Sequence, residues 1–184
     1  MTIDKGIELD TPLTEDKIKK LRAGDMVFLT GTVYGARDMA HQRLIAAIKG
    51  GQQLPLDLEN STVFYVGPSP TPPHRASGSV GPTTSARMDS LTEPLLKQGL
   101  RAMIGKGKRS PAYRRLLKKY SAVYMVAVGG IAACLGLKIK SIKPLAYQDL
   151  GAEAIYEIKL DRFPLFVAYD VYGGDIFAEA LRKE

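Results

Sequence analysis

Four short segments of the chain each combine a glycine-containing turn with Thr, Arg or Lys side chains. Glycine lets the backbone approach a ligand closely, and amide groups at the start of a helix favour a bound anion. Arg offers a planar fork that matches a carboxylate, and Lys offers a point charge. Together these residue types predict a site for a small anion, built from segments 30–41 (TGTVYGARDMAH), 67–73 (GPSPTPP), 77–89 (SGSVGPTTSARMD) and 104–111 (IGKGKRSP).

Three cations of these segments, Arg37, Arg87 and Lys106, lie where a strand is expected to pass into a helix. This placement predicts that they can grip one dianion together. No single motif is diagnostic, because IGKGKRS lacks the glycine spacing of a P-loop and the chain has no full GxGxxG fingerprint. Any one turn could be an ordinary turn with solvated cations, but four such turns in one small chain favour a site.

Positive charge is concentrated in one stretch of the sequence. The chain carries 26 Lys and Arg against 19 Asp and Glu, a net charge of +7. Between Pro94 and Gln148 there is no Asp or Glu, while twelve Lys and Arg residues lie there. Such a stretch attracts nucleic acid, an acidic protein, or a small polycarboxylate or phosphate, unless it is only a solvated basic helix face. The absence of aromatic interleaving and of a recognised nucleic-acid module argues against nucleic acid.

Length and composition restrict the class of protein. A chain of 184 residues predicts one domain, 1–184, in which residues 1–22 form an N-terminal extension with a short helix. The single cysteine, Cys134, excludes a disulfide framework, a cysteine-built zinc site and a self-contained iron–sulfur cluster. We therefore expect no metal ligands in this chain. No apolar run could span a bilayer and the N-terminus lacks a signal-peptide core, so we expect a cytoplasmic protein without membrane contact.

Hydrophobic periodicity predicts strands and helices that alternate early, followed by a strand-rich C-terminal part. Pro94, two residues after Thr92, predicts that one helix is broken near Thr92. The pattern predicts an α/β or α+β fold with a mixed sheet rather than a pure doubly wound fold. The expected strands cover 25–34, 62–66, 101–105, 122–128, 139–147, 154–160 and 165–171, and the expected helices follow Thr14 or cover 36–51, 88–99, 110–120 and 129–136.

Three other residues could bind or react but also have ordinary structural explanations. His41 lies one helical turn after Arg37, so it could face the same ligand, or it could be an exposed or capping histidine. His74 lies in a Pro-rich loop, where we expect it to be exposed to solvent. Cys134 lies among small residues of an expected helix, where we expect a buried structural thiol.

Seven segments of the sequence, taken together, match the pattern of one protein family. They are TGTVYGARDMAH, LPLDL, VFYVGPSP, SVGPTTSARMD, MIGKGKRSP, AVYMVAVGGIAA and AYQDLGAEAIYEIKLDRFP. The chain thereby resembles the β subunit of class I, iron–sulfur-dependent fumarate hydratases and L(+)-tartrate dehydratases, a unit that forms the C-terminal domain of single-chain members. The resemblance extends from Asp25 to Asp170, and its most specific part is GPTTSxRMD followed by GKGxRS.

The resemblance implies a swivelling β/β/α domain that works with a partner in a hetero-oligomer. In the family, an α subunit holds a [4Fe–4S] cluster on three cysteines, and the free iron acts as a Lewis acid on the leaving hydroxyl. The implied reaction is the reversible addition or removal of water on a four-carbon dicarboxylate, malate to fumarate. The motifs do not distinguish this reaction from the conversion of L(+)-tartrate to oxaloacetate.

The resemblance also implies roles for individual residues. Arg37, Arg87 and Lys106 match the family's carboxylate-binding cations, and Thr83 matches the hydroxyl proposed as the catalytic base. A threonine hydroxyl is a poor base unless a neighbour activates it, and Asp38 is our candidate activator. The positions expected to support the site or to form turns are Asp38, Gly81, Thr84 and Asp89.

Two functions of other classes stay open from the sequence. A nucleic-acid-binding module would use the acid-free stretch and bind with a steep salt dependence. A cluster-free sensor would bind dicarboxylates without an α subunit.

Overall fold

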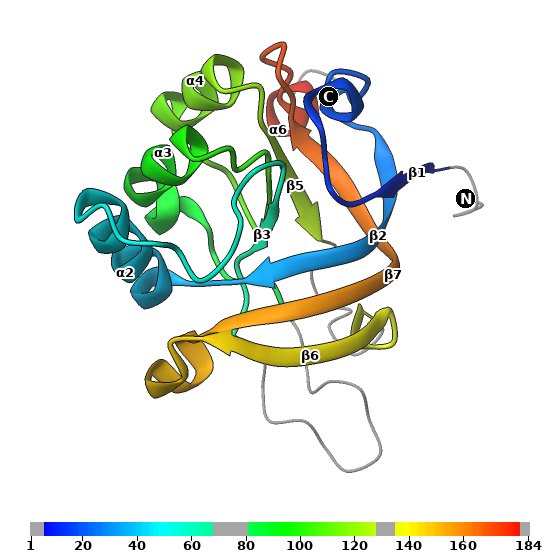
Figure 1. Ribbon diagram of the computed structural model, residues 1–184. Coiled ribbons are helices and arrows are strands. Elements are labelled where there is room, and N and C mark those ends of the chain that lie inside the picture. The colour runs from blue at the N-terminus through cyan, green and yellow to red at the C-terminus, as the bar shows by residue number, and fades with distance from the viewer. Residues whose placement is uncertain (1–5, 68–80, 128–134, 181–184) are drawn as a thin grey trace.

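The computed structural model describes residues 6–67, 81–127 and 135–180 (Figure 1). Within these residues, seven strands form one sheet in the order β1-β2-β3-β4-β5-β7-β6, and β2 also pairs with β7. The strands are β1 (Ile7–Asp10), β2 (Met26–Gly35), β3 (Thr62–Phe64), β4 (Ala102–Gly105), β5 (Val123–Ala127), β6 (Ile139–Ala146) and β7 (Ile155–Tyr169). The helices are α1 (Glu15–Ile18), α2 (Asp38–Lys49), η1 (Ala86–Met88), α3 (Asp89–Lys97), α4 (Pro111–Lys119), η2 (Gln148–Glu153) and α6 (Ile176–Ala180).

Strand β7 closes the sheet into a barrel. It pairs antiparallel with both β5 and β2, so that β2, β3, β4, β5 and β7 form a closed ring of five strands of mixed direction. Strands β2 to β5 run parallel to one another. Strand β1, parallel to β2, and strand β6, antiparallel to β7, extend the sheet beyond the ring. The expected α/β fold with a mixed sheet is therefore confirmed, and its barrel, extra strands and helices agree with a swivelling β/β/α domain.

The alternation of side chains along the strands divides the core into two clusters. On β4, Ile104 belongs to the cluster on the inner face of the barrel, whereas its neighbour Met103 packs beneath the helices. The same alternation separates Phe64 from Tyr65 at the end of β3. Figure 1 shows α2, α3 and α4 side by side on the outer face. Tyr65 therefore reaches the helix layer at the point where the site segments begin.

Helix α3 is not broken at Thr92, and this expectation was wrong. The helix runs from Asp89 to Lys97 with Pro94 inside it, and the Thr92 hydroxyl donates to the Met88 carbonyl at 2.7 Å rather than capping a new turn. Leu95 and Leu96 on the following turn are buried. Their burial offsets the roughly 3 kcal/mol that proline costs inside a helix.

Strand β7 is continuous where the sequence predicted two strands, 154–160 and 165–171. A register irregularity in its pairing with β2, between Leu29 and Gly31, accommodates the change of direction. At this point Arg162 has a φ of 50° and its backbone N–H donates to the Thr30 hydroxyl at 3.0 Å. The bulge lets the strand bend without ending, which a linear pattern of hydrophobic residues does not reveal.

Strand β1 lies within the expected N-terminal extension, where the sequence predicted only a helix. It pairs in parallel with β2, with Ile7 opposite Val27 and Asp10 opposite Thr30. Leu9 of this strand joins the cluster on the inner face of the barrel. In the part of the chain that the structure describes, no helix is both long and apolar enough to cross a membrane.

Candidate active site

Thr83 is held between the ends of β3 and β4 by two hydrogen bonds to one carbonyl group. Its backbone N–H donates to the Tyr65 carbonyl at 3.0 Å, and its hydroxyl donates to the same oxygen at 3.2 Å. On either side of it, Pro82 forms a bridge with Val66 and Thr84 forms a bridge with Lys106. The segment that carries Thr83 thus adds to the sheet at the carboxyl ends of two parallel strands.

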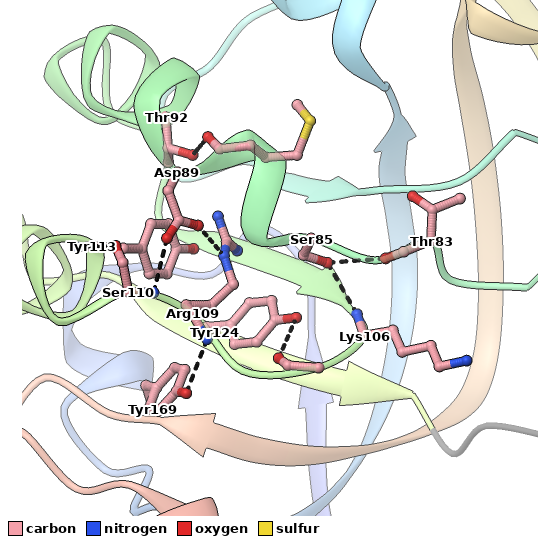
Figure 2. A network of polar contacts seen from close by, with 12 residues as sticks. Thr83, Ser85, Asp89, Thr92, Lys106, Arg109, Ser110, Tyr113, Tyr124 and Tyr169 are labelled. Carbon is pink, nitrogen blue, oxygen red and sulfur yellow. Dashed lines mark hydrogen bonds and ion pairs between the residues drawn. The ribbon is translucent and has the colours of Figure 1, made fainter.

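Ser85 joins this segment to the one that carries Lys106. The Lys106 N–H donates to the Ser85 hydroxyl oxygen at 3.0 Å, and the Ser85 N–H donates to the Lys106 carbonyl at 3.1 Å. The approach is close because Gly105 has no side chain: a Cβ there would lie 2.0 Å from the Ser85 Oγ. Figure 2 shows Thr83 and the Lys106 side chain on the same side of this junction. The exposed Lys106 is therefore anchored by its backbone near the Thr83 hydroxyl.

Arg37 and Arg87 meet at the carboxylate of Asp38. The Arg87 Nε lies 2.7 Å from one Asp38 oxygen, and the Arg37 Nε lies 4.0 Å from the other. Arg37 is the N-cap residue of α2 and Asp38 is the first residue of that helix, whereas Arg87 belongs to η1. Two of the three predicted cations therefore converge, although they come from segments 50 residues apart in the chain. Lys106 is linked to this pair through the segment that contains Thr83.

The Arg37 side chain is further held by Glu153 and by Gly67 of the predicted segment 67–73. Its Nη2 lies 3.6 Å from Glu153, whose other oxygen accepts the Met39 N–H at 3.0 Å near the start of α2. Gly67 packs against the guanidinium, because a Cβ at this position would lie 2.7 Å from the Arg37 Nη1. Glu153 lies in the quoted segment AYQDLGAEAIYEIKLDRFP, yet it carried no predicted role. The role of this carboxylate follows from the packing of η2 against α2, which the sequence did not predict.

His41 is fully buried, so of the alternatives that the sequence left open, an exposed histidine is ruled out. Its Nδ1 donates to the Arg37 carbonyl at 2.8 Å, and its ring lies 5.6 Å from that of Tyr65. Burial lowers the pKa of His41 from 6.5 to about 4, which keeps the ring neutral at physiological pH. His41 therefore supports the Arg37 backbone from behind and presents no charge to a ligand.

Asp89 supports the site through Arg109, a partner that the sequence did not predict. One of its oxygens lies 2.5 Å from the Nε of Arg109, and the other accepts the Ser110 N–H at 2.8 Å. The Arg109 side chain is completely buried. In the sequence, Arg109 is one cation within a basic run, and only its place in the motif GKGxRS distinguishes it.

Among the described residues, the remaining predicted positions, Gly81 and Thr84, take no part in the side-chain contacts given above. Gly81 is partly buried and Thr84 is exposed. Because the Thr83 hydroxyl faces the Tyr65 carbonyl and the Asp38 carboxylate faces Arg87, the described residues contain no hydrogen bond between Thr83 and Asp38. The proposed activation of Thr83 stays a prediction. His74 and Cys134 lie outside the described residues.

This arrangement brings together residue types that are suited to carboxylate chemistry. Two guanidiniums approach one carboxylate, and the backbone of an exposed lysine is anchored next to the segment that carries a threonine hydroxyl. Among the described residues, no three His, Cys, Asp or Glu side chains gather in a group that could hold a metal ion. Guanidinium and ammonium groups are suited to binding carboxylates.

The chain belongs to the family described as "Fumarase C-terminus", whose pattern matches residues 2–180. It is 37% identical over 177 residues to the "Putative L(+)-tartrate dehydratase subunit beta" of Methanocaldococcus jannaschii, with 93% of this chain and 91% of that protein covered. It is 31% identical over 180 residues to the L(+)-tartrate dehydratase subunit beta of Escherichia coli, with 93% and 86% covered.

The chain is also similar to much longer proteins. It is 35% identical over 182 residues to the anaerobic class I fumarate hydratase of Escherichia coli, with 97% of this chain but only 33% of that protein covered. The chain therefore spans about a third of such a fumarate hydratase and most of the tartrate dehydratase β subunits. The family resemblance found in the motifs is confirmed.

Proposed function

We propose that this chain is the β subunit of an iron–sulfur-dependent hydro-lyase that reversibly adds or removes water on a four-carbon dicarboxylate, converting malate to fumarate. One observation carries the proposal: Arg37 and Arg87 converge on the side-chain carboxylate of Asp38. A carboxylate group already occupies the place where the substrate carboxylate would bind. The family membership supports the same class of reaction.

The substrate carboxylate would compete with Asp38 for Arg87. The Arg87 and Asp38 side chains are 44% and 25% exposed, so their ion pair is partly hydrated and weak. Arg87 uses Nε toward Asp38, and a diacid could engage its guanidinium in a bidentate contact. Lys106 would then bind the second carboxylate group of the same molecule.

The cations would also promote removal of a proton from the substrate. Loss of a proton next to a carboxylate builds enediolate-like charge, so fixed cations stabilise the transition state more than the ground state. We assign acceptance of this proton to the hydroxyl of Thr83, which is held near Lys106 by the Ser85 hydrogen bonds.

Asp38 is the residue that we propose as activator of Thr83. When a substrate carboxylate takes Arg87, the Asp38 carboxylate loses its 2.7 Å partner and becomes free to accept a proton. The variant Asp38→Asn should then lower the rate constant for dehydration while substrate binding stays intact. An unchanged rate constant with intact binding would rule out this role.

The chain needs a partner for this reaction. It contains one cysteine, so a cluster on three cysteines does not fit this polypeptide, and we assign the [4Fe–4S] cluster to an α subunit. When bound there, the cluster supplies a Lewis acid for the leaving hydroxyl. The present chain supplies the cations and the hydroxyl.

The decisive experiment is anaerobic co-expression of this chain with an iron–sulfur α subunit, followed by assays on malate and on L(+)-tartrate. Activity should require both polypeptides. Robust hydration of fumarate by the isolated chain would overturn the proposal.

Dehydration of L(+)-tartrate to oxaloacetate is the second candidate function. It is favoured by one observation, the near full-length match to proteins named as tartrate dehydratase β subunits. The ratio of kcat/KM for malate to kcat/KM for L(+)-tartrate, measured on the same complex, decides between the two substrates.

A nucleic-acid-binding module is a weaker alternative. Several cations of the acid-free stretch pair with carboxylates that lie outside it, such as Arg114 with Asp175 at 2.6 Å and Lys140 with Asp161 at 2.7 Å. This pairing reduces the charge available to a polyanion. Tight binding of duplex DNA with a steep salt dependence would revive that alternative.

A further inference from the structure

Arg109 lies behind the two segments that carry Thr83, Arg87 and Lys106. Its guanidinium Nε lies 2.5 Å from Asp89, and its backbone N–H donates to the Tyr169 hydroxyl at 3.1 Å. Figure 2 shows this arrangement, with Arg109 and Asp89 on one side of the junction and the Lys106 side chain on the other. The ion pair therefore joins the two segments at a point away from the exposed cations.

Tyrosine rings enclose the Arg109 guanidinium. Its Cζ lies 3.5 Å from the ring centre of Tyr113, 4.8 Å from that of Tyr124 and 5.3 Å from that of Tyr65. Burial raises the pKa of Tyr124 to about 12 and that of Tyr113 well above its usual value of 10, so both phenols stay neutral. Among the described residues, Asp89 is thus the anionic partner of this charge through Nε, whereas Nη1 and Nη2 are buried among the rings without a hydrogen-bond partner.

The same cluster reaches the other parts of the site. The Tyr65 carbonyl, at the end of β3, accepts both hydrogen bonds that hold Thr83. The Tyr65 ring lies 5.6 Å from that of His41, which in turn donates to the Arg37 carbonyl. Arg109 therefore contacts, directly or through one neighbour, the segments that carry all the predicted site residues.

We infer that the Arg109–Asp89 pair is a positioning device that sets the relative placement of Arg87 and Lys106 for a diacid. The inference rests on the proposed function. Within the described residues, the two segments are joined at Ser85 and Lys106 in front and at Asp89 and Arg109 behind. If the two segments were joined at one point only, they could rotate about it. Two junctions prevent this rotation and so fix the directions in which Arg87 and Lys106 point.

The test uses two substitutions of Arg109 and a matched control in the complex with the α subunit. Arg109→Lys keeps the charge but loses the planar fork, and Arg109→Met loses both. The control is Arg114→Lys, because Arg114 also pairs with a carboxylate, Asp175 at 2.6 Å, and also lies near a tyrosine ring, 5.7 Å from the ring centre of Tyr169. It therefore tests whether disturbing this shared neighbour of Arg109 is enough to change the kinetics. The control residue belongs to α4, and among the described residues no hydrogen bond or ion pair joins its side chain to residues 81–89.

Kinetics separate positioning from a merely structural role. For Arg109→Lys we expect kcat/KM for the diacid to fall by about 10- to 100-fold per folded complex, with a raised KM, because small misplacements of binding groups are costly. Arg109→Met should be more severe, and Arg114→Lys should change kcat/KM by less than about twofold. If Arg109→Lys lowers thermal stability while the folded complex keeps its KM and kcat, the pair is only structural and the inference is wrong.

Amide hydrogen exchange on the chain gives a readout that does not require turnover. The N–H groups of Ser85 and Lys106 are hydrogen-bonded across the junction, and that of Thr83 to the Tyr65 carbonyl beside it, so all three report on its opening. Their exchange should be at least about tenfold faster in Arg109→Lys and unchanged in Arg114→Lys. Equal exchange in all three proteins would overturn the inference. If the wild-type complex acts on neither diacid, the proposed function fails, while these amides still decide whether the pair fixes the two segments.

Discussion

Two arginine–carboxylate pairs lie at the two ends of the short stretch from Arg87 to Asp89, and they differ in environment. The Arg109 side chain is 0% exposed and that of Asp89 is 16% exposed, whereas Arg87 and Asp38 are 44% and 25% exposed. A buried pair that loses one partner leaves an uncompensated charge. A partly exposed pair can exchange its partner for water or for a ligand at little cost. The first pair is therefore suited to build the site, and the second is suited to open for a substrate.

The largest expected effect tests this contrast by removing one carboxylate from each pair. Asp89→Asn should lower the free energy of unfolding by about 3–5 kcal/mol, because Arg109 stays buried without its anion. Asp38→Asn should lower it by less than about 1 kcal/mol. Urea denaturation of both variants of the isolated chain measures the difference. Similar losses in the two variants would remove the distinction between the pairs.

The pH dependence of stability sharpens the description of the buried region. Because burial lowers the pKa of His41 from 6.5 to about 4, the unfolded chain binds a proton in this interval and the folded chain does not. The stability that depends on neutral His41 is complete above pH 6.5 and falls as the pH drops toward 4, by about 3 kcal/mol in total. His41→Asn keeps a donor for the Arg37 carbonyl but does not titrate. The difference between the wild-type and variant stability curves should therefore follow this slope, and parallel curves would contradict the burial of a neutral ring.

The exposed cations should affect the rate rather than the stability. Arg87→Gln should lower kcat/KM of the complex for its diacid by about 100-fold, because one charge-assisted contact to the developing charge is lost. Arg115→Gln, which removes an exposed arginine of α4, is the control. Lys106→Met should act in the same direction, with the exposed Lys108→Met as its control. Equal activity of a site variant and its control would show that the cation does not touch the substrate.

The smallest effect is expected at the outer contact between η2 and α2. Arg43 and Asp149 form a bidentate pair there, with distances of 2.7 Å and 2.5 Å, but both side chains are largely exposed. Asp149→Asn should leave the midpoint of urea denaturation and the activity of the complex unchanged within error. A clear loss of activity would mean that the position of η2, and with it Glu153, is set by this pair.

The sequence singles out three candidate cations but not the groups that hold them. Arg37, Arg87 and Lys106 are predicted because each lies in or beside a glycine-containing turn near an expected strand–helix junction. Their contact with a substrate stays a prediction. Arg109 and His41 could not be assigned, because their burial depends on tyrosines that other elements bring to them. The sequence around a side chain in a basic run, or near the start of a helix, does not indicate that tyrosine rings from other elements will bury it.

The fold shows the same division between local and long-range information. The mixed sheet and most helices follow from local periodicity, and the unbroken α3 was missed because Leu95 and Leu96 are stabilised by tertiary packing. Closure of the barrel was not predicted, because it requires the pairing of β2 with β7, two strands more than 100 residues apart in the chain. Pairing of this kind depends on registers and bulges that a single sequence does not display.

The absence of a side chain at Gly105 allows the Ser85 and Lys106 segments to lie close together. The Ser85 hydroxyl occupies the volume that a methyl group would fill at this position, and the Tyr124 hydroxyl lies 3.0 Å from the same point. Even an alanine would act as a wedge that drives Ser85 and Lys106 apart. The spacing between the two segments that would bind the diacid therefore depends on the absence of a side chain at Gly105.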